Sequence, residues 1–226
     1  MEYIEVLWAA GMAFWTLLVI YGTRWTYNRW TSQGMEQMVA VYYNRKIVHM
    51  LGAGVVLLVV PFVFTDPLLP LIGGFSLGGF TALMHRSKHR MYWMQNPENM
   101  NDSSFAIMLG FSVYLLWILF DDPWLAVLPS LFMAFGDGVT GVVRNKMFSK
   151  RTKSVWGNVA MAIVCLPMGW FIGAVSITSI PGWGLLSGAL ASFVERYEFG
   201  PIDDNVLIAV ASTLLLILGA TLGPLV

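Results

Sequence analysis

Seven runs of mostly apolar residues, each long enough to cross a lipid bilayer, constrain the fold of this chain more than any other feature. They cover about residues 4–22, 47–64, 67–84, 104–120, 124–143, 157–177 and 206–226, and a bilayer-spanning helix needs about 17–25 such residues. A shorter run rich in Gly and Ala, about residues 182–194, is an eighth candidate. Because backbone groups in lipid must be paired within the segment, these runs predict an all-α integral membrane bundle of about eight transmembrane helices.

The composition agrees with lipid as the surrounding solvent. Of the 226 residues, 57% are hydrophobic and 12% are charged, whereas a soluble domain usually has about 25% charged residues. The formal net charge is zero, so the chain as a whole is not attracted to nucleic acid and we expect no nucleic-acid partner. At this length we expect a single transmembrane domain, residues 1–226.

The distribution of charge predicts the orientation in the membrane. All 13 Lys and Arg residues fall in four connecting segments, about residues 23–46, 85–103, 144–156 and 195–205. The turns between the other span ends contain only acidic charges, at Asp66, Asp121 and Asp122. Since positively charged loops stay in the cytoplasm, we expect the four segments to be cytoplasmic and both termini to lie on the non-cytoplasmic side. Omitting the short eighth span would place Arg196 outside, so the charge pattern favours keeping it.

Asp137 is the most unusual residue within a span. It lies between Gly136 and Gly138 at the cytoplasmic end of the fifth apolar run. An ionisable residue at membrane depth is costly and suggests a function, and the flanking glycines would let the backbone open towards a ligand. The alternative is an ordinary solvated aspartate at a helix end.

Residues 144–154 form a basic segment with five cations and no acid. It could simply anchor the chain to anionic lipid. However, Lys153 and Ser154 come directly before a predicted span, and a helix N-terminus beside a lysine can bind phosphates.

A second acidic group lies between the last two spans, at Glu195 and at Asp203-Asp204-Asn205. Adjacent Asp203 and Asp204 would repel each other unless a cation lies between them and a partner. Mg²⁺ is the natural cation because it binds carboxylate oxygens and bridges to phosphates. Asp203 or Asn205 could instead cap the last helix.

A third polar group, Arg45, Lys46 and His49, begins the second span. Arg45 and His49 are four residues apart, so they share a helical face with Lys46 close by. His49 could equally be an ordinary interfacial residue. The polar residues 96–104 are interpreted as caps for the fourth span.

These groups together predict a site on the cytoplasmic face for phosphoryl transfer between a nucleotide and a membrane lipid. We expect Asp137 to hold Mg²⁺ with Asp203 or Asp204, while cations hold the phosphates. A lipid hydroxyl needs a base to remove its proton. Glu195 is the first candidate because it ends a helix near the expected metal site; Asp137 is the second and His49 the third.

The ordered set of motifs resembles the polyprenol kinase family, which includes dolichol kinase, phytol kinase and the CTP-dependent diacylglycerol kinase. The resemblance covers about residues 45–210, through Arg45-Lys46 with His49, Gly136-Asp137-Gly138 with Gly141 and Arg144, Lys153-Ser154 with Gly157, and Glu195 with Asp203-Asp204-Asn205. It implies an all-helical membrane enzyme that phosphorylates a lipid alcohol, commonly with CTP. It also implies that residues 136–158 form the nucleotide loop, with nucleotide-binding residues Gly136, Gly138, Gly141, Arg144, Lys153, Ser154, Gly157 and Asn205. The chain departs from the family at Trp156, where the family usually has Glu.

The sequence therefore predicts a CTP-dependent kinase of an isoprenoid alcohol such as dolichol. Residues 1–44 would be an N-terminal span with a cytoplasmic linker, and residues 45–226 the catalytic core. Two alternatives remain: a CTP-dependent cytidylyltransferase that forms a CDP-lipid, and a non-enzymatic membrane protein or transporter.

Overall fold

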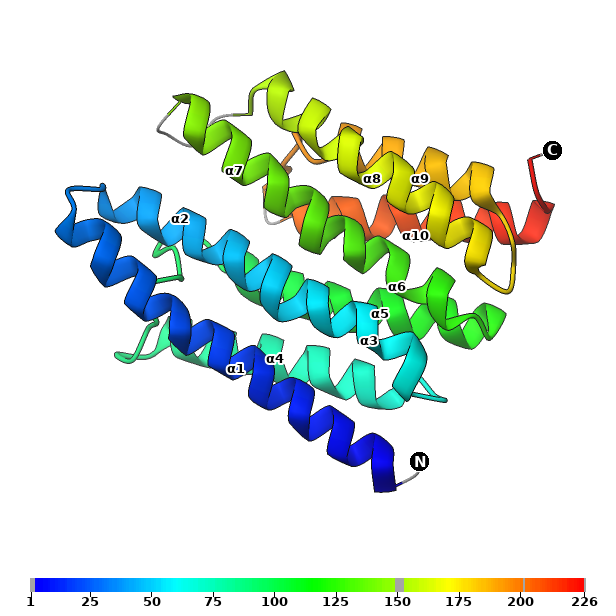
Figure 1. Ribbon diagram of the computed structural model, residues 1–226, viewed down its shortest axis with the longest axis horizontal. Helices are drawn as coiled ribbons and strands as arrows, with labels where there is room; N and C mark the ends of the chain where they lie inside the picture. Colours follow the sequence, from blue (N-terminus) through cyan, green and yellow to red (C-terminus); the bar gives the residue numbers. More distant parts are fainter. Residues whose placement is uncertain (1–2, 149–152, 201, 226) are drawn as a thin grey trace.

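The computed structural model describes residues 3–148, 153–200 and 202–225. In these ranges the chain forms eight continuous helices packed side by side in a bundle, and no β-strand (Figure 1). Two of the eight contain a π-helical segment between α-helical parts. In chain order, the elements are α1 (Tyr3–Ser32), α2 (Gln37–Ile47), η1 (Val48–Gly54), α3 (Val55–Val63), α4 (Leu68–Arg86), α5 (Asn101–Phe120), α6 (Pro123–Leu131), η2 (Phe132–Gly136), α7 (Asp137–Phe148), α8 (Val155–Val175), α9 (Pro181–Val194) and α10 (Asp204–Leu222).

The prediction of an all-α membrane bundle is confirmed. Seven of the helices in the described part of the chain are long and apolar enough to cross a membrane. The eighth, α9, is present where the short Gly- and Ala-rich run predicts it. Its 14 residues extend only about 21 Å at 1.5 Å per residue, less than the ~30 Å thickness of a bilayer core.

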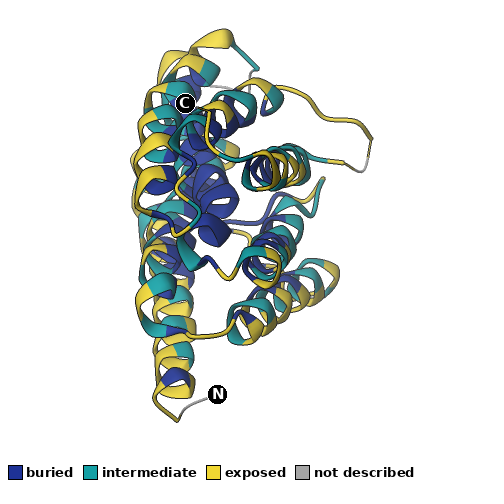
Figure 2. Cartoon of the chain, turned by 90° about the vertical axis from the view of Figure 1, so that its right-hand side faces the viewer, coloured by how far each residue is buried: buried dark blue, intermediate teal, exposed yellow. Residues whose placement is uncertain are grey.

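The helix formed by α6, η2 and α7 is the centre of the bundle. In the apolar stretch of this helix 78% of the residues are buried, compared with 17% in the apolar stretch of α1 at the edge of the bundle. The burial colours in Figure 2 show the same difference. An apolar helix that is buried all round needs protein neighbours on every side. This central position lets α7 contact elements from both halves of the chain, including α2 and α8.

Small residues bring two pairs of helices into close contact. A Cβ on Gly74 of α4 would lie 2.7 Å from the Gly110 Cα of α5, and a Cβ on Gly184 of α9 would lie 2.1 Å from the Gly169 oxygen of α8. Such glycines allow the close backbone approach that membrane helices use for packing. Gly74 and Gly184 therefore serve helix packing.

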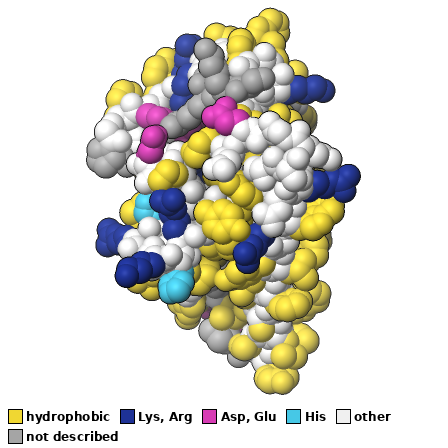
Figure 3. Space-filling view, turned by 90° about the vertical axis from the view of Figure 1, so that its left-hand side faces the viewer, with side chains coloured by type: hydrophobic (Ala, Val, Ile, Leu, Met, Phe, Trp, Pro, Cys, Tyr) yellow, Lys and Arg dark blue, Asp and Glu magenta, His cyan; other side chains and the backbone are white. Residues whose placement is uncertain are grey.

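The two chain ends lie at one end of the bundle, and the α1–α2 and α7–α8 connections lie at the other (Figure 1). Viewed from that second end, the surface carries the grouped cationic and acidic side chains (Figure 3). The predicted loop at residues 23–46 is wrong in detail, because α1 continues to Ser32 and α2 begins at Gln37. Helix α1 has 30 residues, about 45 Å, and therefore extends beyond a bilayer core of about 30 Å. Lys150 and Arg151 of the basic segment lie outside the described residues.

Asp122 lies in the short turn between α5 and α6, as the sequence predicts, and is buried. Its Oδ1 accepts the Leu125 N–H at 3.1 Å and caps α6. Its Oδ2 accepts the backbone N–H and the hydroxyl of Thr178 at 2.8 and 2.7 Å. This carboxylate thus joins the α5–α6 turn to the α8–α9 turn at the end opposite the basic segments.

Candidate functional site

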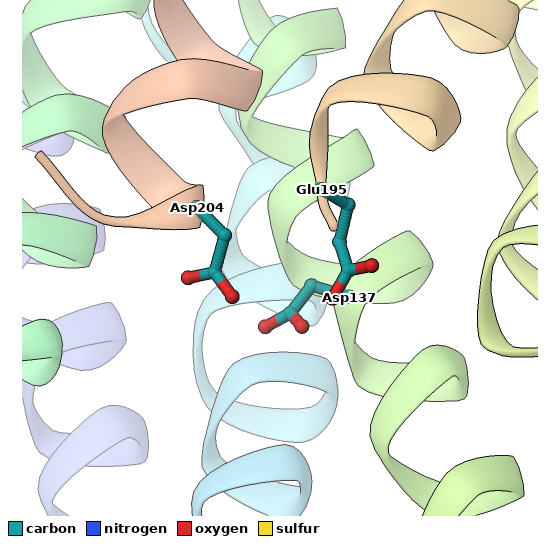
Figure 4. Close-up of side chains that lie close together, drawn as sticks. All are labelled: Asp137, Glu195 and Asp204. Atoms are coloured by element: carbon teal, nitrogen blue, oxygen red, sulfur yellow. The ribbon is translucent and has the colours of Figure 1, made fainter. Parts of the chain in front are cut away.

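A small polar pocket of about 40 Å³ lies at the charged end of the bundle. Ten residues from distant parts of the sequence line it: Tyr42, Arg45, Lys46, Asn96, Asn101, Asp137, Arg144, Lys153, Glu195 and Asp204. Four of these are cations and three are carboxylates. In Figure 4 the three carboxylates, from the start of α7, the end of α9 and the start of α10, point towards one another.

Two π-helical segments aim side chains into this region. Asp137 is the first residue after η2, and His49 is the second residue of η1. A π-helical turn inserts an extra residue into a helix and is frequent at functional sites. The backbone does not open around Asp137 as its flanking glycines predict; it stays helical from Pro123 to Phe148.

Asp137 is held by residues of the second helix. Lys46 Nζ donates to both carboxylate oxygens, at 2.7 and 2.6 Å, and His49 Nδ1 lies 3.4 Å from Oδ2. None of the three side chains is more than 6% exposed. A buried charge is tolerated only when it is paired, so Lys46 and Asp137 depend on each other.

Glu195 is held by Arg144 in a second buried ion pair. The two guanidinium nitrogens donate to the two carboxylate oxygens at 2.7 and 2.8 Å, the bidentate geometry that makes such pairs strong. Arg144 also donates to the Ser154 carbonyl and to Asn158 Oδ1. Burial raises the pKa of Glu195 above its ordinary value, although the hydrogen bonds from Arg144 act in the opposite direction.

Lys153 links the two acidic segments. Its Nζ lies 3.0 Å from Asp204 Oδ2 and 3.0 Å from Glu198 Oε1, and donates to the Glu195 carbonyl at 3.1 Å. Burial opposes the charge, but the carboxylates of Asp204 and Glu195 outweigh it and raise the pKa of Lys153 above its ordinary value. With its side chain 30% exposed, Lys153 is the most accessible of the four cations that line the pocket.

The glycines around the site leave room for side chains. A Cβ on Gly141 would lie 2.3 Å from Lys46 Cε, and a Cβ on Gly157 would lie 2.2 Å from Arg144 Nε. Gly136 faces Cys165 and Gly138 faces Met50. Gly141 and Gly157 therefore allow the two buried cations to reach their carboxylates.

Asp137, Glu195 and Asp204 form a group that could hold a metal ion, because one oxygen from each lies within 4.8 Å of the others. Three carboxylates fit Mg²⁺, which prefers hard oxygen ligands. The sequence predicts Asp203 or Asp204 as the partner of Asp137. In the structure Asp203 instead caps α10, where Oδ1 accepts the Val206 N–H at 3.0 Å and Oδ2 accepts the Ser104 hydroxyl. Burial raises the pKa of Asp203.

The remaining nucleotide-binding candidates lie around the pocket without lining it. The Ser154 carbonyl accepts a hydrogen bond from Arg144. Asn205 is buried and its Nδ2 donates to the Asn101 carbonyl at 3.2 Å. Trp156 is 60% exposed on α8 and does not line the polar pocket.

Sequence reasoning misses the contribution of the segment between α4 and α5. Asn96 and Asn101 line the polar pocket, and Asp102 lies 2.9 Å from Arg45 Nε in a buried ion pair. From the sequence these residues are interpreted only as helix caps. The one signal is Asp102 itself, an acid at the start of an apolar run.

In comparisons with protein-family models, with curated proteins and with solved structures, nothing matches this chain.

Proposed function

We propose that this protein is a lipid kinase that transfers the γ-phosphate of a nucleoside triphosphate to a membrane isoprenoid alcohol of the dolichol or polyprenol type. The proposed donor is CTP. One observation carries the proposal: three carboxylates that could hold a divalent ion share one pocket with four cations at the end of a membrane bundle. Because every Lys and Arg lies in the four predicted cytoplasmic segments, the pocket is proposed to face the cytoplasm.

The charges of the pocket suit a nucleotide with a divalent ion. Among the described residues four cations face three carboxylates, so this part of the lining carries one net positive charge, and a divalent ion would increase it. A triphosphate is strongly negative and is bound best by cations and metal together. Lys153 is the most exposed of the four cations, so it is the one proposed to meet the phosphates first.

The reaction requires positioning and neutralisation of charge. The lipid hydroxyl oxygen forms a bond to the γ-phosphorus, the bond from that phosphorus to the bridging β-phosphate oxygen breaks, and the nucleoside diphosphate leaves. The hydroxyl proton is released. Asp137, Glu195 and Asp204 would hold Mg²⁺, which when bound neutralises charge on the phosphates.

Glu195 and Asp137 have similar proposed roles. Both oxygens of Glu195 accept hydrogen bonds from Arg144, so we assign Glu195 to positioning that guanidinium and to the metal site. Asp137 lies beside His49, on the side of the pocket nearest the apolar interior. Both of its oxygens accept hydrogen bonds from Lys46, so we assign Asp137 to positioning that lysine and to the metal site.

Isotope transfer tests the proposal. Purified protein in lipid nanodiscs is incubated with Mg²⁺, a panel of lipid alcohols and phosphorylated lipids, and CTP, ATP or GTP labelled at either the α- or the γ-phosphate. Transfer of γ-label to an alcohol supports the kinase. Transfer of α-label, with the nucleoside monophosphate, to a phosphorylated lipid would instead identify a cytidylyltransferase. No transfer with any donor would refute both enzymatic functions.

Two lysines provide matched variants for this assay. Lys153→Ala should weaken nucleotide binding by about 1–3 kcal/mol, the value of a charge-assisted contact. Lys146→Ala removes an exposed lysine of α7 that does not line the pocket, and should leave binding unchanged. Equal effects of the two substitutions would contradict the assignment of the pocket.

A further inference from the structure

A large apolar cavity lies between α1, α3, α4 and α5. Its volume is about 360 Å³, and the polar side chains among its lining residues are Thr16 and Ser76. The Thr16 hydroxyl already donates to the Met12 carbonyl. On α1 and α4 the lining includes exposed positions such as Leu17 and Gly73, so the cavity borders the lipid region.

A second, smaller cavity of about 30 Å³ extends this space towards the polar pocket. The two cavities share four lining residues: Thr16, Ala53, Leu77 and Ala106. The smaller cavity is lined further on by His49 and Asp102. The apolar space thus ends at the side chains that separate it from Asp137 and Arg45 of the polar pocket.

Thr81, Asp102 and His49 are polar side chains at this end. Thr81 is already paired with Ser103 and Asp102 with Arg45, which leaves His49. It is 3% exposed, and its Nε2 has no hydrogen-bond partner within the described part of the chain. Phe105 stacks on the ring with centroids 3.9 Å apart, and Nδ1 faces Asp137 at 3.4 Å. A buried polar group left without a partner costs about 1–3 kcal/mol, so Nε2 is suited to a polar atom of a ligand.

We propose that the two cavities bind one hydrocarbon chain of a single-chain lipid alcohol, with its hydroxyl hydrogen-bonded to His49. This inference rests on the proposed function and specifies its acceptor. The α1 wall runs from Ile20 to Ala9, eleven positions or about 16 Å along the helix.

The size of the larger cavity favours one chain over two. If each chain atom takes the ~30 Å³ that a water molecule takes in the liquid, a volume of about 360 Å³ holds about 12 atoms. A lipid with two acyl chains would also place ester oxygens against apolar walls, where they find no hydrogen bond.

Photolabelling tests the site without any nucleotide. The probe is undecanol, whose 12 heavy atoms match the cavity, with a diazirine at its terminal carbon. It is added to the protein in nanodiscs, and labelled residues are located by mass spectrometry. Labels should concentrate on cavity-lining residues of α1, α3 and α4, and excess hexadecanol should remove them more effectively than dioctanoylglycerol. Labels spread evenly over the lipid-exposed helices, or removed equally by both competitors, would overturn the proposal because they indicate ordinary membrane lipid.

A matched pair on α1 checks the position of the chain. Ala13 lines the larger cavity and Ala10 does not, although both are exposed. Ala13→Trp should block the cavity about 10 Å from Ile20 and reduce labelling at least severalfold, whereas Ala10→Trp should not. Octanol is short enough to end before the introduced tryptophan. In Ala13→Trp it should therefore still compete for the site with a diazirine probe of the same length. Equal labelling of the two variants would refute the site.

Competition by an alcohol and by an alkane tests the hydrogen bond between the hydroxyl and His49. In the unchanged protein hexadecanol should compete with the probe better than hexadecane does. His49→Leu should remove this preference, and His49→Gln should retain part of it. A preference that survives His49→Leu would overturn the role of His49.

The lipid site and the kinase proposal can fail independently. If labelling behaves as expected but no nucleotide phosphorylates the alcohol, the kinase proposal fails and the lipid site stands. Phosphorylation with labels outside the cavity would instead support the kinase and refute the lipid site.

Discussion

Replacing Gly141 by alanine tests the structural role of the glycines around Asp137. The new Cβ would lie 2.3 Å from Lys46 Cε and 2.9 Å from its Cδ and Cγ, whereas carbon atoms in contact are about 3.5–4.0 Å apart. Lys46 must therefore move by more than about 1 Å. Its Nζ is only 2.6 and 2.7 Å from the Asp137 oxygens, so this shift breaks the ion pair.

The magnitude follows from burial of the pair. Removing one partner of a buried ion pair costs about 3–5 kcal/mol, while alanine in place of a helical glycine stabilises by about 0.5–1 kcal/mol. Gly141→Ala should thus lower the free energy of unfolding by about 2–4 kcal/mol. Gly79→Ala is the control, since no atom of the described residues lies within 4 Å of a Cβ at that position. That substitution should instead stabilise by up to about 1 kcal/mol.

The assay is reversible unfolding in mixed micelles, by titration with sodium dodecyl sulfate and far-ultraviolet circular dichroism. A Lys46→Met background completes the test, because Asp137 has then already lost its cation and Gly141→Ala should add no further cost. If Gly141→Ala stabilises like Gly79→Ala, or costs as much in the Lys46→Met background as alone, the reasoning from Lys46 is refuted.

The metal site, Lys153 and the membrane orientation can each be tested separately. Loss of even an outer-shell partner of a metal costs about 10–100-fold in affinity, so Asp204→Asn should weaken Mn²⁺ binding, measured by electron paramagnetic resonance, by at least about tenfold. Asp203→Asn should not, because asparagine caps α10 as well as aspartate; equal losses would contradict the division between ligand and cap. The pKa of Lys153 is raised in the folded state, so the stability that Lys153 contributes is present at neutral pH and is lost as the pH rises through that raised value. The difference in unfolding free energy between the unchanged protein and Lys153→Met should therefore persist at mildly alkaline pH and shrink above pH 10.5, the ordinary value; a difference that is already lost at mildly alkaline pH would contradict it. Finally, an impermeant thiol reagent outside intact cells should label Asp66→Cys and not Lys88→Cys, with little background from buried Cys165, and the reverse pattern would invert the proposed orientation.

The helices and their environment can be predicted from the sequence alone. Runs such as residues 104–120 and 157–177 are too apolar and too long for anything except a helix in lipid, because lipid offers no partner to the backbone. Helices α5 and α8 lie where these runs predict them. The segment at 23–46 is less determined: its mixed polar composition fits a loop, but packing of α1 against α2 keeps it mostly helical.

For the candidate site, the sequence identifies which charged residues are exceptional, since an ion at the end of an apolar run needs a reason to be there. Asp137 is a candidate on this ground. Lys153, Glu195 and Asp204 are candidates from their charged segments, and Arg144 from the family resemblance. All five line one pocket. Their partners cannot be read from the sequence. Arg144 and Glu195 are 51 positions apart, and Lys46 and Asp137 are 91 apart.

Which charge meets which is a property of the packed bundle. The two π-helical segments set the direction of His49 and Asp137, yet no sequence pattern predicts them. The glycines are equally ambiguous: the family resemblance implies that Gly141 and Gly157 belong to a nucleotide loop, but in the bundle they lie beneath Lys46 and Arg144. Local composition specifies helices because the backbone must satisfy its own hydrogen bonds in lipid. The pairing of buried charges depends on how the finished helices pack, and packing involves the whole chain.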